Sequence, residues 1–226
     1  MRTPMVVNHP WPPVVPPQAR VLVLGSMPSP LSLEKDFFYG HNRNAFWFII
    51  DALLHANTPS KADTLSAASV TTADAPDFDF LALEYTEDSE EFIPVARPPA
   101  PLVECCKARK HAALHKLRIA LWDVCSSCRR VGASDGTMTD VLPNDFETLF
   151  KQHPTIEHVV FNGKSVQSLW KRHVEPQQRL PPLTYHMAPS TSPAYACLCI
   201  EEKVQQWVTV LQRVIQPNST RLLGDL

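Results

Sequence analysis

Arg20-Val-Leu-Val-Leu-Gly25 decides the fold class of this chain, because it is a short apolar run that ends in glycine. Such a run is typical of a strand buried on both faces of a parallel sheet. Working outward from it, three further strands are predicted, at 117–124, 157–161 and 183–187. Helical patterns flank and separate the strands, at 44–54, 105–116, 145–152, 164–173 and 197–215. The alternation predicts an α/β protein, a three-layer α/β/α sandwich with a mostly parallel four-stranded sheet.

These elements form one expected domain over residues 20–215. Residues 1–19 carry six prolines and are expected to be an extended, flexible arm. The stretch at about 57–104 is rich in Ala, Ser, Thr, acidic residues and Pro and lacks core periodicity, so we expect a disordered insertion. Residues 216–226 are expected to be a tail, and Asn144 is expected to cap the helix at 145–152.

The charge of the chain is distributed unevenly. Its 226 residues include 21 Lys and Arg against 23 Asp and Glu, a net of −2. Between Asn57 and Glu104 two basic residues face ten acidic ones, so the remainder has a net charge of +6. Two interpretations stay open: an acidic loop on an ordinary solvated surface, or a polyanion-binding domain that carries an acidic insertion.

Composition also excludes several classes of protein. No apolar stretch reaches the roughly 18 residues of a membrane span, and the proline-rich start is no secretory signal. We therefore expect an intracellular protein without membrane association. The six cysteines fall as Cys105-Cys106, Cys125-x-x-Cys128 and Cys197-x-Cys199. Only one pair has metal-site spacing, so we expect reduced thiols, no metal and no cofactor.

Ligands of open α/β sheets bind beyond the carboxyl ends of the strands. The segments at those ends are 25–42, 123–136, 162–164 and 188–194. The first contains neither a P-loop nor a Rossmann glycine fingerprint. The last reads Ala188-Pro-Ser-Thr-Ser-Pro-Ala194, and short hydroxyl side chains between prolines suit phosphate oxygens.

Three motifs in these loops, at 25–29, 39–47 and 189–194, resemble those of the uracil-DNA glycosylase superfamily. The likeness is strongest to the hypoxanthine-DNA (deoxyinosine) glycosylase branch, and it extends to the mismatch-specific uracil and thymine glycosylases. It covers about residues 20–56 and 113–215, and the segments 121–124 and 144–146 add to it. The resemblance implies a uracil-DNA glycosylase-like fold. It also implies hydrolysis of deaminated bases, hypoxanthine or uracil, from DNA in base-excision repair.

The resemblance assigns a role to particular residues of this chain. Asn44 would position the attacking water, and DNA containing deaminated or mismatched bases would be the partner. The residues that would bind the base are Gly25, Ser26, Met27, Pro28, Tyr39, His41 and Asp123. Those that would bind the DNA backbone are Pro189, Ser190, Thr191 and Ser192.

Three positions depart from the pattern of the superfamily. Met27 stands where many relatives have Asp or Asn, which is a mark of the hypoxanthine branch, where the asparagine equivalent to Asn44 serves instead. Asn42 replaces the usual proline after His41, and Ala188 begins the last motif in place of Leu, His or Asn. These departures leave a second hypothesis open, an inactive DNA- or nucleotide-binding module of the same fold.

The residue types in these loops are consistent with this chemistry even when the resemblance to the superfamily is set aside. Cleavage of an N-glycosidic bond passes through an oxocarbenium-like sugar, and the base leaves as an anion. A water held by an amide such as Asn44 is then a sufficient nucleophile. Backbone N–H groups of Ser26 and Met27 would stabilise the leaving base. The base would be flipped into the pocket and stacked on Tyr39.

Each of these residues also has a structural alternative. Asn44 fits a helix cap, and Tyr39 fits a loop anchor. Asp123 either accepts from the ring N–H of hypoxanthine or uracil, or caps a turn. His41 binds water or phosphate, or makes a structural hydrogen bond. Asn162-Gly163 is predicted to be a turn rather than a base reader.

The main hypothesis is a monofunctional glycosylase, because the motifs contain no lysine nucleophile. We expect a monomer, located in the nucleus rather than the mitochondrion if the source is eukaryotic. A weaker third hypothesis is a glycosidase that uses Glu34 and Asp36.

Overall fold

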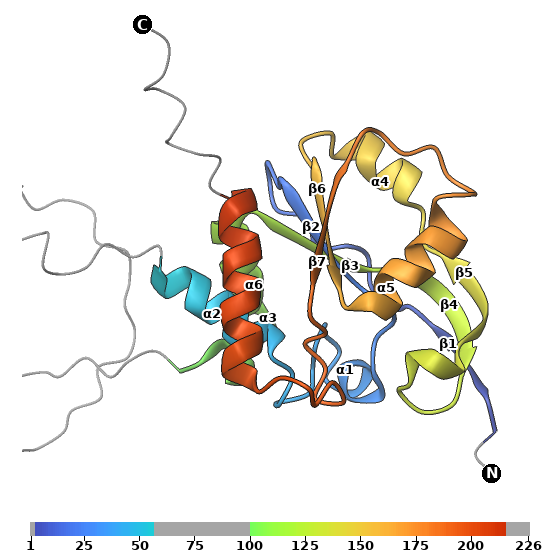
Figure 1. The fold of residues 1–226 in the computed structure, drawn as a ribbon, viewed down its shortest axis with the longest axis horizontal. Helices are drawn as coiled ribbons and strands as arrows, with labels where there is room; N and C mark the ends of the chain where they lie inside the picture. The colour runs from blue at the N-terminus through green and yellow to red at the C-terminus, as the bar shows by residue number, and fades with distance from the viewer. Residues whose placement is uncertain (1–2, 57–99, 216–226) are drawn as a thin grey trace, which may run out of the picture.

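The computed structural model describes residues 3–56 and 100–215, and its core is a sheet of four parallel strands (Figure 1). The strand order is β3–β2–β6–β7, with bounds Ile119–Asp123, Val21–Gly25, His158–Asn162 and Thr184–Ala188. Every residue of β2 and β3 is buried, as expected for strands covered on both faces. All four predicted strands and their parallel arrangement are confirmed.

Helices cover both faces of this sheet (Figure 1). One side carries α2 (Phe46–Ala56), α3 (Lys107–Leu117) and α6 (Ile200–Ile215). The other carries α4 (Phe146–Gln152) and α5 (Lys164–Leu169), which continues as the π-helical turn η3 (Trp170–Val174). The predicted helices are confirmed, except that 164–173 is divided between α5 and η3. The short helix α1 (Pro30–Glu34), capped by Ser29, was not predicted.

A second, antiparallel sheet was not predicted. It has the order β1–β4–β5, with bounds Met5–Asn8, Cys125–Arg130 and Thr139–Pro143. Strand β1 comes from the N-terminal segment, which then runs along β3, where Val14 and Leu121 exchange two backbone hydrogen bonds of 2.9 Å. In place of the expected flexible arm, this segment is extended and held by backbone pairing.

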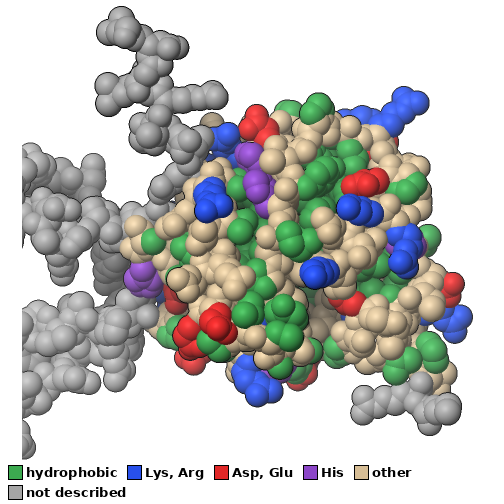
Figure 2. Space-filling view, viewed as in Figure 1, with side chains coloured by type: hydrophobic (Ala, Val, Ile, Leu, Met, Phe, Trp, Pro, Cys, Tyr) green, Lys and Arg blue, Asp and Glu red, His purple; other side chains and the backbone are tan. Residues whose placement is uncertain are grey.

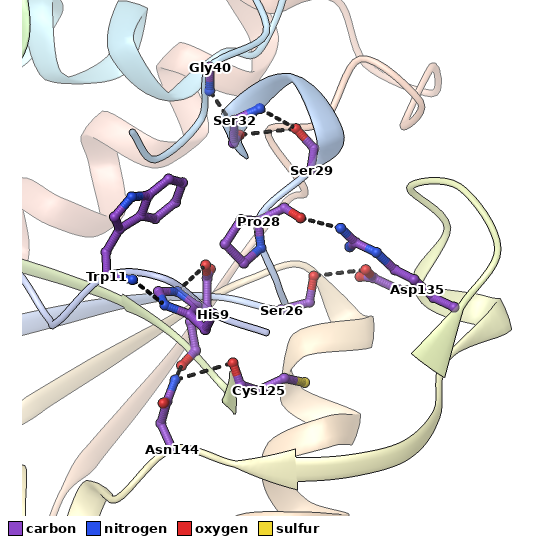
Figure 3. A network of polar contacts seen from close by, with 12 residues as sticks. His9, Trp11, Ser26, Pro28, Ser29, Ser32, Gly40, Cys125, Asp135 and Asn144 are labelled. Atoms are coloured by element: carbon purple, nitrogen blue, oxygen red, sulfur yellow. Dashed lines mark hydrogen bonds and ion pairs between the residues drawn. The ribbon is translucent and has the colours of Figure 1, made fainter. Parts of the chain in front are cut away.

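The cap of α4 also differs from the prediction. The carboxylate of Asp145 accepts a hydrogen bond from the Thr148 N–H at 2.9 Å, so Asp145 is the cap. Asn144 is buried, and its Nδ2 donates to the carbonyls of Asp123 at 2.9 Å and Cys125 at 3.2 Å. Asn144 therefore ties together the turn from β3 to β4 (Figure 3).

The end of the expected insertion has a defined place. The turn η1 (Leu102–Glu104) contacts α2, and the side chain of Leu102 is buried. The Leu102 N–H donates to the carboxylate of Asp51 at 3.3 Å. Residues 102–104, which the expected insertion included, are therefore packed against the domain. The rest of that expectation, and the expected tail, lie outside the described residues.

The surface carries mixed charge. Figure 2 shows Lys and Arg side chains at several separate places on one face, interspersed with apolar and acidic ones. None of the described helices is long and apolar enough to cross a membrane.

Candidate active site

The loops that follow the parallel strands surround one cavity of about 900 Å³ at the carboxyl end of the sheet. Such a position is where α/β sheets bind ligands. All the predicted site residues line it: Gly25, Ser26, Met27, Pro28, Tyr39, His41, Asn44, Asp123, Pro189, Ser190, Thr191 and Ser192. The prediction that these loops meet is confirmed, while the role of each residue stays a prediction.

Gly25 and Asp123 are register partners at the ends of β2 and β3. A Cβ at residue 25 would lie 2.1 Å from Asp123 Oδ1 and 3.1 Å from Tyr39 Oη. Glycine is therefore required at this position by close packing. The side chain of Asp123 fills the space above it and lines the cavity.

Asn44 precedes α2 and is 8% exposed. Its Oδ1 accepts a hydrogen bond at 3.0 Å from the N–H of Phe46, the first residue of α2, so the side chain satisfies a backbone donor at the start of the helix. A carbonyl oxygen has two lone pairs, so this bond leaves one for a water in the cavity. The capping role and the proposed catalytic role are therefore compatible in one side chain.

Tyr39 has a φ of 54°, and its ring packs on Phe46 with the centroids 4.3 Å apart. Its hydroxyl is buried and has no hydrogen-bond partner among the described residues. The nearby amide of Asn162 is already paired at both ends with Thr191. Burial, and then the negative charge of Asp123, raises the pKa of Tyr39, so the phenol stays neutral.

The loop at 188–194 is tied to the end of β6. Asn162 Nδ2 donates to Thr191 Oγ1, and the Thr191 N–H donates to Asn162 Oδ1, both at 2.8 Å. Gly163 has a φ of 96°, and a Cβ there would lie 3.0 Å from the Cβ of Ser190. These contacts support the prediction that Asn162-Gly163 is structural.

Helix α6 holds the same loop from the other side. Lys203 Nζ donates to the Ser192 carbonyl at 2.9 Å, and Trp207 Nε1 donates to the Pro189 carbonyl at 2.7 Å. Burial lowers the pKa of Lys203. The loop backbone is therefore held in place before any ligand binds.

The loop after β2 is held by a carboxylate that sequence reasoning missed. Asp135 lies in the turn η2 (Asp135–Thr137) and accepts from Ser26 Oγ and Ser165 Oγ, each at 2.7 Å. The carbonyl of Pro28, which Figure 3 labels, accepts a hydrogen bond from Arg130. No local sequence pattern marks Asp135, because its partners lie in distant segments of the chain.

His41 is partly exposed, and its Nδ1 accepts from the Arg43 N–H at 3.0 Å. This contact agrees with the structural alternative for His41. Glu34 and Asp36 are not among the residues that line the cavity. Asp36 instead accepts from Trp11 Nε1 at 2.7 Å and from Lys107, so the glycosidase hypothesis lacks a site.

Cys125 and Cys128 are buried in β4, and burial raises the pKa of both thiols. Thiols of this kind are poor nucleophiles at neutral pH. Within residues 3–56 and 100–215, no group of three or more His, Cys, Asp or Glu side chains is placed to hold a metal ion. The expectation that the chain needs no metal stays a prediction.

The chain is an α/β protein with a cavity at the carboxyl end of its parallel sheet, and a proline- and serine-rich loop borders that cavity. No protein-family model matches the chain. Its similar proteins include a hypoxanthine DNA glycosylase of Methanosarcina barkeri, 25% identical over 154 residues, which are 68% of this chain and 70% of the relative. Another, of Methanosarcina acetivorans, is 23% identical over 159 residues, which are 70% of this chain and 73% of the relative.

The fold has a solved counterpart as well. The solution structure of a putative uracil DNA glycosylase from Methanosarcina acetivorans matches with a TM-score of 0.61 and 20% identity. The match covers 94% of this chain and all of the other. In sequence the chain is therefore similar to proteins named hypoxanthine DNA glycosylase, and in fold it is similar to a putative uracil DNA glycosylase.

Proposed function

We propose that this chain is a monofunctional DNA glycosylase that hydrolyses the N-glycosidic bond of deaminated bases, hypoxanthine first and uracil second. One observation carries the proposal: Asn44, Tyr39 and Asp123 line a single cavity, next to the loop at 189–192. The relatives named hypoxanthine DNA glycosylase support the same reaction.

The first step is capture of a flipped nucleotide. The hydroxyl groups of Ser190 and Ser192 contact the phosphates, on a loop already fixed by Asn162, Lys203 and Trp207. The target base leaves the duplex and enters the cavity. There it stacks on Tyr39, whose ring is itself supported by Phe46.

The second step is recognition of the base. Hypoxanthine and uracil both carry a ring N–H, whereas adenine and cytosine carry a lone pair on the corresponding ring nitrogen. The carboxylate of Asp123 accepts a hydrogen bond from the ring N–H and repels the lone pair. This single contact separates deaminated bases from their parents.

The third step is bond cleavage. A water that donates to Asn44 Oδ1 attacks the sugar as the bond to the base breaks, and the base leaves as an anion. Ser26 and Met27 line the cavity, and we propose that their backbone N–H groups stabilise that charge. The oxygen of the water stays on the sugar and the proton it loses ends on the base anion, so the products are the neutral free base and an abasic site.

The test is a base-release panel with the whole chain. Duplexes that carry one hypoxanthine, uracil, xanthine or mismatched thymine are incubated with excess protein, with and without later alkali. We expect release of hypoxanthine fastest, and strand breaks only after alkali. Breaks without alkali would instead point to an amine nucleophile such as Lys164, which lines the cavity. Tight binding with release of no base would favour the inactive module.

A further inference from the structure

His9 contacts the candidate active site from the opposite end of the sequence. Its Nε2 lies 2.9 Å from Oδ2 of Asp123, 114 residues away. Strand β1 and the backbone pairing of Val14 with Leu121 bring it there. Its side chain is only 2% exposed, against 5% for that of Asp123. Figure 3 shows His9 within a polar network that includes Trp11 and Asn144.

The hydrogen bond at Nδ1 of His9 determines which of the two ring nitrogens carries the proton. Nδ1 accepts from the Trp11 N–H at 3.3 Å, so it has a lone pair, and the proton of the neutral ring lies on Nε2. His9 therefore donates to Asp123 Oδ2. Both ring nitrogens are used, and the ring is buried, so His9 itself does not contact a substrate.

Because His9 donates to only one oxygen of Asp123, the two carboxylate oxygens differ in their hydrogen bonding. Oδ2 is occupied by His9. Oδ1 lies above Gly25, where a Cβ would be 2.1 Å away, and among the described residues it has no hydrogen-bond donor. Asp123 lines the cavity, so Oδ1 is its free acceptor.

We infer that His9 is a specificity-determining positioning residue, which holds Asp123 so that Oδ1 accepts a hydrogen bond from the ring N–H of the flipped base. This inference rests on the proposed function. Without His9, the carboxylate rotates about its side-chain bonds and its acceptor is no longer fixed toward the base. We therefore expect slower release and weaker binding for bases that carry the ring N–H, and no such change for bases that lack it.

The experiment compares two bases in the same duplex, hypoxanthine and unsubstituted purine. Purine has a lone pair where hypoxanthine has its N–H, so it cannot use the contact. We expect His9→Ala to slow single-turnover release of hypoxanthine by about tenfold or more, the effect of one hydrogen bond to a charged group. Release of purine should change less than twofold. If purine is released too slowly to measure, the dissociation constants of the two duplexes are compared instead. That comparison uses chains that also carry Asn44→Ala, with and without His9→Ala.

Two further variants separate positioning from a structural effect. Glutamine places an N–H donor close to the position of histidine Nε2, so His9→Gln should restore most of the preference for hypoxanthine. Val14→Ala loosens the same N-terminal segment without touching His9, because Val14 packs on β3. It should lower the melting temperature and leave the ratio of the two rates unchanged.

Three outcomes would overturn the inference. They are an equal loss on both bases in His9→Ala, no rescue by glutamine, and a changed ratio in Val14→Ala. If the wild-type chain releases neither base and binds both equally, the proposed function fails. If it releases hypoxanthine and His9→Ala does so equally well, only the inference about His9 fails.

Discussion

At the scale of single residues, Asn44 carries two roles that can be separated. Asn44→Ala removes both the helix cap and the amide, so we expect base release to fall by about 10²–10³-fold and stability by about 1 kcal/mol. Asn44→Ser keeps a capping oxygen but withdraws the amide from the cavity. It should restore the melting temperature and not the single-turnover rate. A serine variant within tenfold of the wild-type rate would assign the chemistry to another residue.

Tyr39 offers a second test at this scale, because its buried hydroxyl has no partner among the described residues. An unsatisfied buried polar group costs about 1–3 kcal/mol, so Tyr39→Phe should raise the free energy of unfolding. The aromatic ring remains, so base release should stay close to wild type. Tyr39→Ala is the control, because it removes the ring on which the flipped base stacks. It should weaken binding of the base by about 1–3 kcal/mol. Slow release by the phenylalanine variant would mean that the hydroxyl contacts the substrate.

At the scale of elements, the end of β6 positions the DNA-binding loop. Asn162→Ala removes two buried hydrogen bonds to Thr191, and we expect weaker binding of duplex DNA together with a lower melting temperature. Thr191→Val removes only the hydroxyl partner and keeps the backbone bond, so its effect should be smaller. Dissociation constants for an inosine duplex and thermal melts measure both variants. Equal affinity in all three proteins would show that the loop does not need this anchor.

The same scale explains which elements could be predicted. The central strands are apolar runs, and local sequence is enough to recognise a strand buried on both faces. Strand β4 reads Cys-Ser-Ser-Cys-Arg-Arg and has no apolar alternation. Its pairing with β1 depends on backbone hydrogen bonds, which nearly every residue type offers, so the sequence pattern does not indicate it.

At the scale of the whole molecule, charge is the property to test. Deleting residues 60–100 removes two basic and nine acidic residues, so the net charge rises from −2 to +5. The ends of the deletion can be joined, because α2 ends at Ala56 and the Leu102 N–H contacts Asp51 of the same helix. We expect a folded, active protein that binds DNA more tightly, with a steeper dependence of log K on log salt.

The measurement for this deletion is affinity for duplex DNA between about 50 and 200 mM salt, with thermal melting as the check on folding. An unfolded variant would make the segment part of the structure. Unchanged affinity across the salt range would place its charge far from the bound DNA.

The sequence by itself determined the parallel sheet, the order of its helices and the four loops that meet at its carboxyl edge. Those features follow from local patterns, because apolar runs must be buried and parallel strands end at one edge. Only the tertiary structure decided which polar groups are partners. It showed that Asn144 ties a turn, that Asn162 is committed to Thr191, and that His9 orients Asp123. These pairs join segments that are distant along the chain, and such contacts exist only once the backbone has brought both segments to the same place.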